Sequence, residues 1–307
     1  MGRVAVRVPA VPPAAQPDPR RVPGHPRAHP GGQDRPLLNP GLGDVSGLCA
    51  PPSVNARAVE TLLAPHVATE TLRIVRDARP VGADRHADTI RAVEFALADG
   101  DRLVVAADVV LDATETGKLL ALAGAEHTVG AESAAETGEP HAPDEPNPDD
   151  QQAITWCFAV EDRAGEDHTI AKPHDYETWR DRRWPFWPGS QLSWTDLDPI
   201  RLRPRTIRLH EPGLRRDRWT YRRIGARSLL ADRSTEQDVT LVNWPQNDCW
   251  TRPLVDSTDP TSAQPWYESA AARDAKALSR AFLYWMQTEA PEPTAAPGTR
   301  GCSSAPT

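Results

Sequence analysis

The sequence predicts an α/β protein that also contains an irregular, Trp- and Pro-rich α+β region, and three observations support this. A valine-rich run from Leu103 to Leu111 ends at Asp112 and a short turn, after which Leu119, Leu120 and Leu122 follow with helical spacing. A run with so little polar alternation is typical of a strand buried on both faces. Residues 89–114 predict a hairpin, and residues 176–250 hold seven of the ten tryptophans among many prolines.

The elements before this run are predicted in order from local patterns. Residues 53–67 predict a helix, because Ser53 is a suitable N-cap and Val59, Leu62 and Leu63 share a face. Residues 71–81 alternate in polarity as a strand does. The hairpin at 89–114 turns at residues 98–101, where Gly100 supplies the positive φ that such a turn needs.

Two further segments are predicted after the hairpin. Residues 131–150 are acidic and Pro-rich and predict a long loop. Residues 267–290 predict an amphipathic helix, since apolar side chains recur at steps of three and four residues. These apolar residues are Ala271, Ala275, Leu278, Ala281, Phe282 and Trp285.

Charge, cysteine usage and hydropathy exclude several classes of protein. The net charge of −8 over 307 residues disfavours a nucleic-acid partner. The four cysteines, at positions 49, 157, 249 and 302, lack the spacing of a zinc site or a disulfide framework. No apolar run approaches the roughly 18 residues that a membrane span requires, and the first 30 residues lack the apolar core of a signal peptide. We therefore expect a cytoplasmic protein without a metal.

Composition divides the chain into four parts. Residues 1–36 and 292–307 predict disordered tails, residues 37–130 the α/β part and residues 131–291 the Trp-rich part. The tails have two interpretations: they are natural disordered ends, or they are translated in a shifted reading frame. The second is favoured, because residues 293–307, back-translated with GC-rich codons and slid by one base, can read DGGTGYPGLLLRPD, which resembles how a known protein family continues. On that interpretation the chain is an incomplete form of a longer protein.

Several strings, taken together and in order, resemble the bacterial FAD-dependent oxidoreductase family. They are LNPGLGDVSGLC, VVLDATETGKLLALAGAEHTVGAESAAETGEPHAPDE, QQAITWCFAVE, WTYRRI, DVTLVNWPQNDCW and LSRAFLYWMQTEAP. The resemblance spans residues 37–291. It implies a partial FAD/NAD(P)-binding-type sheet with helices, FAD as cofactor, and hydride transfer from a small-molecule substrate to the flavin.

The resemblance also implies where the cofactor lies. Val109–Thr114 would be a strand that returns to the FAD-binding sheet, and Asp112, Ala113, Thr114 and Glu115 would line the nucleotide. Glu115 stands where many relatives carry Gly. Lys118 stands where an acidic residue is expected, and its side chain faces either a phosphate or solvent. The GxGxxG loop that cradles the pyrophosphate in this family does not follow any strand predicted in residues 1–60.

Candidate residues for catalysis and substrate binding lie in the second half. His141, between acidic residues, is either a proton acceptor or a surface histidine. In NWPQNDCW, Trp244, Asn247 and Asp248 either bind a polar substrate or form a packed turn.

The tryptophans at 179, 184, 187 and 194 form either a stacking platform for sugars or part of the core. The platform would support a rival function, a non-enzymatic carbohydrate-binding module.

Overall fold

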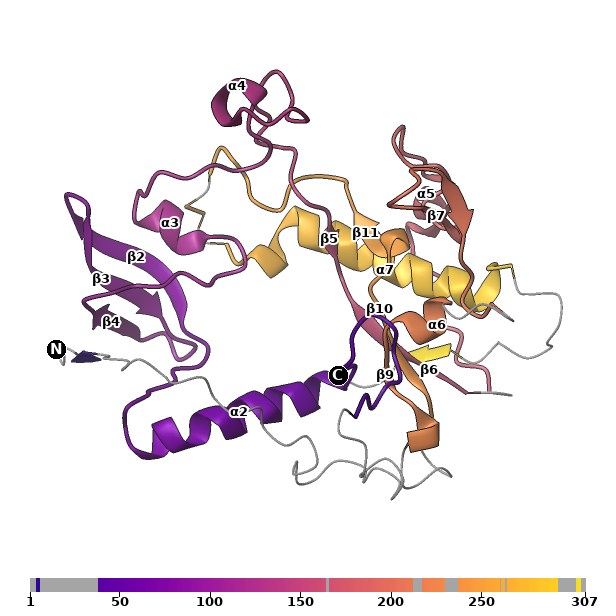
Figure 1. The fold of residues 1–307 in the computed structure, drawn as a ribbon, viewed down its shortest axis with the longest axis horizontal. Helices are drawn as coiled ribbons and strands as arrows, with labels where there is room; N and C mark the ends of the chain where they lie inside the picture. The colour runs from indigo at the N-terminus through magenta and orange to yellow at the C-terminus, as the bar shows by residue number, and fades with distance from the viewer. Residues whose placement is uncertain are drawn as a thin grey trace. The chain divides into compact units, whose positions relative to one another are not determined.

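The computed structural model describes residues 4–5, 38–163, 166–211, 217–229, 237–259, 261–262, 264–291 and 302–304 (Figure 1). They form a mixed α/β protein with small sheets, divided into two compact units. Unit 1 comprises residues 58–152 and 252–269 with strand β1, and unit 2 comprises residues 38–57, 153–251 and 270–291 with strand β12. These units differ from the predicted division at 130/131, which stays a prediction, and residues 252–269 belong to unit 1.

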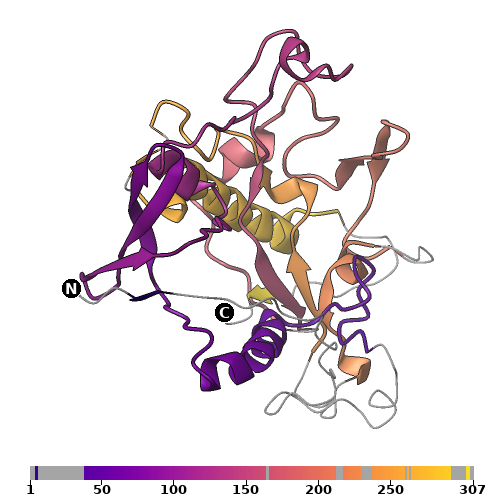
Figure 2. The same cartoon turned by 60° about the vertical axis from the view of Figure 1, so that its left-hand side comes forward.

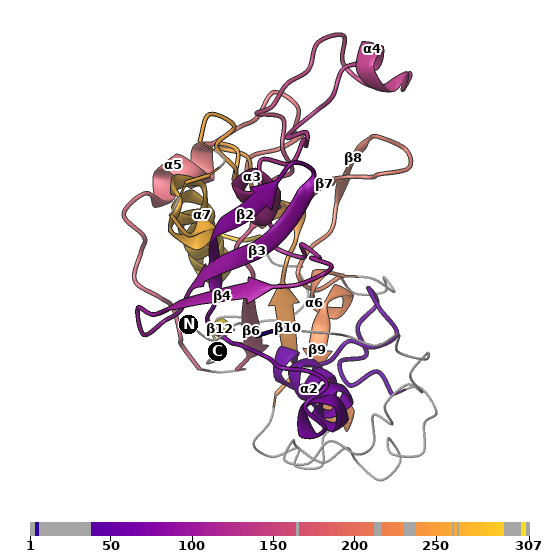
Figure 3. The same ribbon diagram turned by 90° about the vertical axis from the view of Figure 1, so that its left-hand side faces the viewer.

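Unit 1 is built on a four-stranded sheet in the order β1-β4-β3-β2 (Figure 3). Its strands are β1 (Val4–Ala5), β2 (Arg79–His86), β3 (Thr89–Ala96) and β4 (Arg102–Ala106). Strands β2, β3 and β4 are antiparallel, and β1 runs parallel to β4. The predicted hairpin is confirmed: the Leu97 N–H donates to the Asp101 carbonyl across 2.9 Å, and Gly100 has a φ of 92°.

Two predicted strands of unit 1 differ from the observed ones. The strand predicted at 71–81 begins only at Arg79, because Asp77 adopts a left-handed φ of 53° that interrupts extended backbone. The buried strand predicted to reach Leu111 ends at Ala106, and Val109 and Leu111 are 73% and 88% exposed. Neither residue pairs with a strand of the described sheet, so the apolar side chains stay in solvent.

The helices at this end of the chain are short or exposed. Helix α2 (Pro52–Ala68) confirms the prediction at 53–67, and it begins with Pro at its first position, where the missing N–H costs nothing. It has no buried residue, and both Val59 and Leu62 are exposed. Helices α3 (Lys118–Leu122) and α4 (Ala134–Thr137) and the 3-10 turn η4 (Trp266–Glu268) complete the helical elements in the described part of unit 1.

Unit 2 is built on an antiparallel sheet in the order β12-β6-β10-β9, accompanied by two small strand pairs. The sheet consists of β6 (Phe158–Asp162), β9 (Arg223–Gly225), β10 (Val239–Val242) and β12 (Cys302–Ser304). The pairs are β5 (Ile154–Thr155) with β11 (Asp248–Cys249), and β7 (Thr195–Leu197) with β8 (Pro204–Thr206). The helical elements are α5 (Tyr176–Asp181), α6 (Arg218–Tyr221), η2 (Arg227–Leu229), η3 (Pro245–Asn247) and α7.

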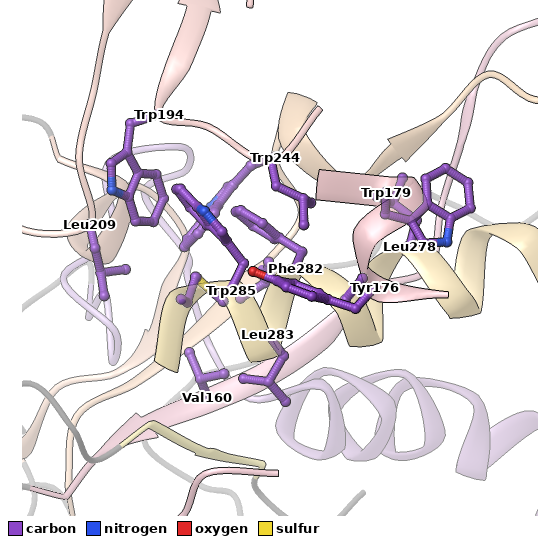
Figure 4. Close-up of a cluster of buried hydrophobic side chains, with 14 of the residues drawn as sticks. Val160, Tyr176, Trp179, Trp194, Leu209, Trp244, Leu278, Phe282, Leu283 and Trp285 are labelled. Atoms are coloured by element: carbon purple, nitrogen blue, oxygen red, sulfur yellow. The ribbon is translucent and has the colours of Figure 1, made fainter. Parts of the chain in front are cut away.

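Helix α7 (Ala270–Thr288) organises the core of unit 2 and confirms the amphipathic helix predicted from the sequence (Figure 2). All six apolar residues of the predicted face are buried. The helix packs against α5, β5, β11 and η3. In this core, the Trp285 ring lies 4.9 Å from Trp194 and stacks on Phe282 at 5.6 Å, and the Trp244 ring lies 5.9 Å from Phe282 (Figure 4).

Short strands from both predicted tails join the sheets. Strand β1 pairs with β4, and β12 pairs with β6. The rest of both tails lies outside the described residues, so their predicted disorder stays a prediction. In the part of the chain that the structure describes, no helix has the length and apolar character of a membrane span.

Candidate functional site

The segment Asp112–Glu115 forms the loop that starts helix α3. The Asp112 carboxylate accepts a hydrogen bond from the Thr114 N–H across 2.9 Å and another from the Leu119 N–H across 3.2 Å. The Thr114 hydroxyl accepts the Lys118 N–H across 2.8 Å. These side chains satisfy backbone donors that a helix N-terminus leaves without partners. Asp112 and Thr114 therefore have a local structural role.

The surroundings of this loop differ from those expected for a nucleotide-binding strand. Val109–Thr114 is irregular rather than the returning strand that the resemblance implies, and Ala113 and Glu115 are exposed. Lys118 takes neither of its two predicted positions: its Nζ donates to the Ser262 carbonyl across 2.6 Å. Burial lowers the Lys118 pKa, although the Asp259 charge opposes this.

The glycine-rich loop 41–47, which does not follow a strand in the described residues, also packs closely against other parts of the protein. A Cβ on Gly41 would lie 1.9 Å from the Arg223 carbonyl oxygen, and one on Gly43 would lie 2.7 Å from the same atom. The Arg223 Nε in turn donates to the Gly41 carbonyl across 2.7 Å. The glycines thus permit close packing of this loop on strand β9, where a phosphate has no room. As folded here, the Gly41–Gly43 loop does not fit the pyrophosphate of FAD.

His141 lies on an exposed turn that follows helix α4. The turn is held by a capping box, in which the Glu136 carboxylate accepts hydrogen bonds from the Ser133 N–H and hydroxyl. These bonds lower the Glu136 pKa. The Ala134 N–H closes the loop onto the Pro143 carbonyl. His141 belongs to unit 1 with Asp112, whereas the predicted substrate residues belong to unit 2.

The NWPQNDCW segment is a packed turn for two of its three candidate residues. Trp244 is buried in the core. Asn247 is fully buried, its Oδ1 accepting the Trp244 N–H across 2.9 Å and its Nδ2 donating to the Ser279 hydroxyl across 3.4 Å. The Ser279 hydroxyl donates to the Trp156 carbonyl, so Asn247 ties this turn to helix α7 and to the end of β5.

The Asp248 side chain is less buried than those of Trp244 and Asn247. It is partly buried, and one of its oxygens accepts the Thr155 hydroxyl. Burial raises its pKa, whereas the Thr155 hydroxyl and the charges of Arg222 and Arg218 act in the opposite direction. A half-buried carboxyl with a raised pKa and arginines nearby is typical of a binding or proton-transfer position.

The four tryptophans of the predicted stacking platform do not lie on one surface. Trp179 and Trp194 are buried, and Trp194 packs in the core of unit 2. Trp184 and Trp187 instead contact Trp250, with ring centroids 6.2 and 5.4 Å apart, in a cluster that includes the exposed Phe186. Of the two predicted alternatives, Trp179 and Trp194 therefore take the one in the core, where their large apolar rings are buried.

A cluster of charged residues was missed by the sequence interpretation. Asp196 is buried and accepts hydrogen bonds from Arg218 across 2.8 Å and from Arg205 across 3.0 Å. Asp196 also acts electrostatically on Asp248, which lies 52 positions later in the sequence. The WTYRRI string contains Arg218's neighbours and Arg222, but no local pattern connects them to Asp196.

Comparison with known proteins gives one match. Residues 27–305 match the model of a protein family described as FAD dependent oxidoreductase. Neither the curated proteins nor the solved structures include a significant match to this chain. In the described residues, no group of three His, Cys, Asp or Glu side chains is placed to hold a metal ion.

Proposed function

Because the chain belongs to the FAD dependent oxidoreductase family, we propose that it takes part in the oxidation of a small-molecule substrate by FAD. FAD is the cofactor of this family, and it supplies the chemistry by accepting a hydride. The observation that carries the proposal is the family match over residues 27–305.

The proposed cofactor segment is Asp112–Glu115, with Asp112, Ala113, Thr114 and Glu115 offering backbone groups to the nucleotide. In the fold described here the Asp112 carboxylate is already engaged by two backbone N–H groups. Contact between the nucleotide and the Thr114 N–H therefore requires the α3 loop to rearrange.

The proposed substrate residues are Trp244, Asn247 and Asp248, and their supported roles differ. Trp244 and Asn247 hold the turn in place, as their burial and hydrogen bonds indicate. Asp248 is the residue proposed to contact substrate, because its carboxyl is partly accessible and lies among arginines. His141 is proposed to accept a proton from the substrate, since histidine is the side chain that most often does so in enzymes.

The experiment is an anaerobic assay of flavin reduction. The purified chain is mixed with excess FAD and with a panel of alcohols, amines and hydroxy acids, and the loss of the visible flavin absorbance is followed. We expect reduction with at least one class of compound, and a rate at least about tenfold lower for Asp248→Asn, since removing one catalytic or binding group costs at least that much.

Asp198→Asn is the matched control, because it removes an equal charge from unit 2 at a residue outside the site. This control should reduce flavin at the rate of the unmodified chain. Binding of FAD without reduction by any compound in the panel would contradict the proposed function.

A further inference from the structure

The charged cluster of unit 2 centres on a buried ion pair. The side chains of Arg218 and Asp196 are 5% and 4% exposed, and the Arg218 Nη2 donates to the Asp196 carboxylate across 2.8 Å. Arg205 donates to the same carboxylate from the more exposed rim. A buried pair of this kind loses its hydration, so every remaining donor in it needs a partner.

Arg222 brings a second guanidinium to this cluster. It follows helix α6, four residues after Arg218, and α6 lies beside strand β10 (Figure 3). Both arginines act on the Asp248 carboxyl electrostatically, so the two cations and Asp248 share one region of unit 2. Asp248 is joined to Gln246 through the Gln191 amide, which donates to the backbone carbonyls of both residues.

Two donors of this cluster lack an acceptor. Among the described residues, the Nε atoms of Arg218 and Arg222 are shut off from solvent and have no hydrogen-bond partner. An unsatisfied buried donor costs about 1–3 kcal/mol, and more when it is charged. The described residues contain six buried side-chain atoms without a hydrogen-bond partner, and these two belong to positively charged groups of the same cluster. A bound ligand would supply their acceptors.

The charges of the cluster indicate what that ligand is. Arg205, Arg218 and Arg222 face two carboxylates, Asp196 and Asp248. Three guanidinium groups beside two carboxylates leave one positive charge of this cluster without a counterion among these five residues. A single added anion restores the balance.

We propose that Arg218 and Arg222 bind a carboxylate group of the substrate, beside Asp248. The site rests on the proposed function and narrows its substrate class to organic acids. A carboxylate offers two acceptor oxygens in one plane, which suits guanidinium N–H donors. It carries one charge, whereas a phosphate carries about −1.5 to −2 and would exceed what the cluster lacks.

The test measures anion binding without flavin. The melting temperature of the purified chain is recorded in sodium acetate, sodium phosphate and sodium chloride at equal ionic strength. We expect acetate to raise the melting temperature in a saturable way, because a ligand that binds only the folded state stabilises it. Phosphate should give a smaller rise, and chloride should serve as the baseline.

Arg222→Gln tests the proposed residue. It removes the charge while keeping a polar side chain, and it leaves the Arg218–Asp196 pair in place. We expect acetate affinity to fall at least about tenfold, equivalent to about 1.4 kcal/mol. Arg222→Lys should recover part of it. The matched control is Arg203→Gln, an exposed position of unit 2 where the same charge is lost and affinity should not change.

Several outcomes would overturn the proposal. The absence of an acetate-dependent rise in the unmodified chain does so whatever the variants show, and so does equal acetate binding by Arg222→Gln and the unmodified chain. A larger effect of phosphate would assign the arginines to a phosphate instead. Because no flavin is present, failure here differs from failure of the flavin-reduction assay, which tests the proposed function alone.

Discussion

At the scale of single residues, some polar side chains are fully hydrogen-bonded within the fold, whereas others remain partly accessible. Asn247 and Asp248 are adjacent in the sequence and both polar. The Asn247 amide oxygen accepts the Trp244 N–H, and its amide nitrogen donates to the Ser279 hydroxyl. Asp248 keeps a carboxyl whose pKa is raised by burial. The difference arises from which side of the turn each residue faces.

The raised Asp248 pKa has a defined effect on stability. A carboxyl with a higher pKa in the folded state binds its proton more tightly there than in the unfolded chain. It therefore contributes stability that is fully present below the unfolded pKa of about 3.9 and is lost as the pH rises through the folded pKa. We expect Asp248→Asn, which cannot ionise, to melt at a higher temperature than the unmodified chain at pH 7 but not at pH 3.

Asp198→Asn is the control with the opposite sign. The N–H groups of Arg201 and Ile200 lower the Asp198 pKa, so its contribution is present above the unfolded pKa and is lost as the pH falls. This variant should melt at a lower temperature than the unmodified chain at pH 7, and the difference should shrink at pH 3. A lower melting temperature for Asp248→Asn at pH 7 would contradict the burial argument.

At the scale of elements, a helix is stabilised by the rest of the fold where its apolar face is buried. Helix α7 buries its predicted face against aromatic rings from distant segments, whereas α2, of similar length, has no buried residue. Helical stability in proteins comes mostly from packing of such a face rather than from intrinsic propensity. We therefore expect substitutions in α7 to affect the whole of unit 2.

Trp285→Ala tests this expectation. The ring contacts Trp194 and Phe282, so its removal leaves a cavity that costs about 3–5 kcal/mol. Arg280→Ala, on the exposed side of the same helix, should change stability by no more than about 0.5 kcal/mol. Urea unfolding followed by tryptophan fluorescence measures both, and similar losses for the two variants would show that α7 is not the centre of the core.

At the scale of the whole molecule, family membership and geometry lead to different expectations for FAD. The family uses FAD, but segment Asp112–Glu115 and the Gly41–Gly43 loop are engaged in protein contacts. The sequence also contains no GxGxxG motif, whose loop and helix supply N–H groups and a helix dipole to the pyrophosphate. Binding of FAD by this chain should therefore be weak.

Gel filtration after addition of FAD measures this prediction. We expect the visible flavin band to separate from the protein peak, leaving well under one FAD per chain. Exposed Val109 and Leu111 should also lower solubility, since unpaired apolar backbone promotes aggregation. A stoichiometric flavin band that stays with the protein would contradict the prediction and would show that the α3 loop rearranges.

The sequence by itself determined the family, the presence of the hairpin that begins at Thr89, the helix predicted at 53–67 and the buried face of α7. These features depend on local spacing and on strings of neighbouring residues, which are visible in one dimension. It did not determine where the strand after Leu103 ends, because a valine-rich run stays a strand only while a neighbouring strand bonds to it, and β4 stops at Ala106.

Only the tertiary structure decided the fates of the candidate site residues. Trp179 and Trp194 are buried in the core, and the side chains of Asp112 and Asn247 accept hydrogen bonds from backbone N–H groups of their own turns. Asp196, Arg218 and Arg222 act electrostatically on Asp248. Burial and electrostatic partners depend on segments that are tens of residues apart in the chain. A local sequence pattern does not show which of two neighbouring polar side chains becomes buried. Burial removes hydration, and this loss shifts the pKa values of the ionisable groups in this cluster.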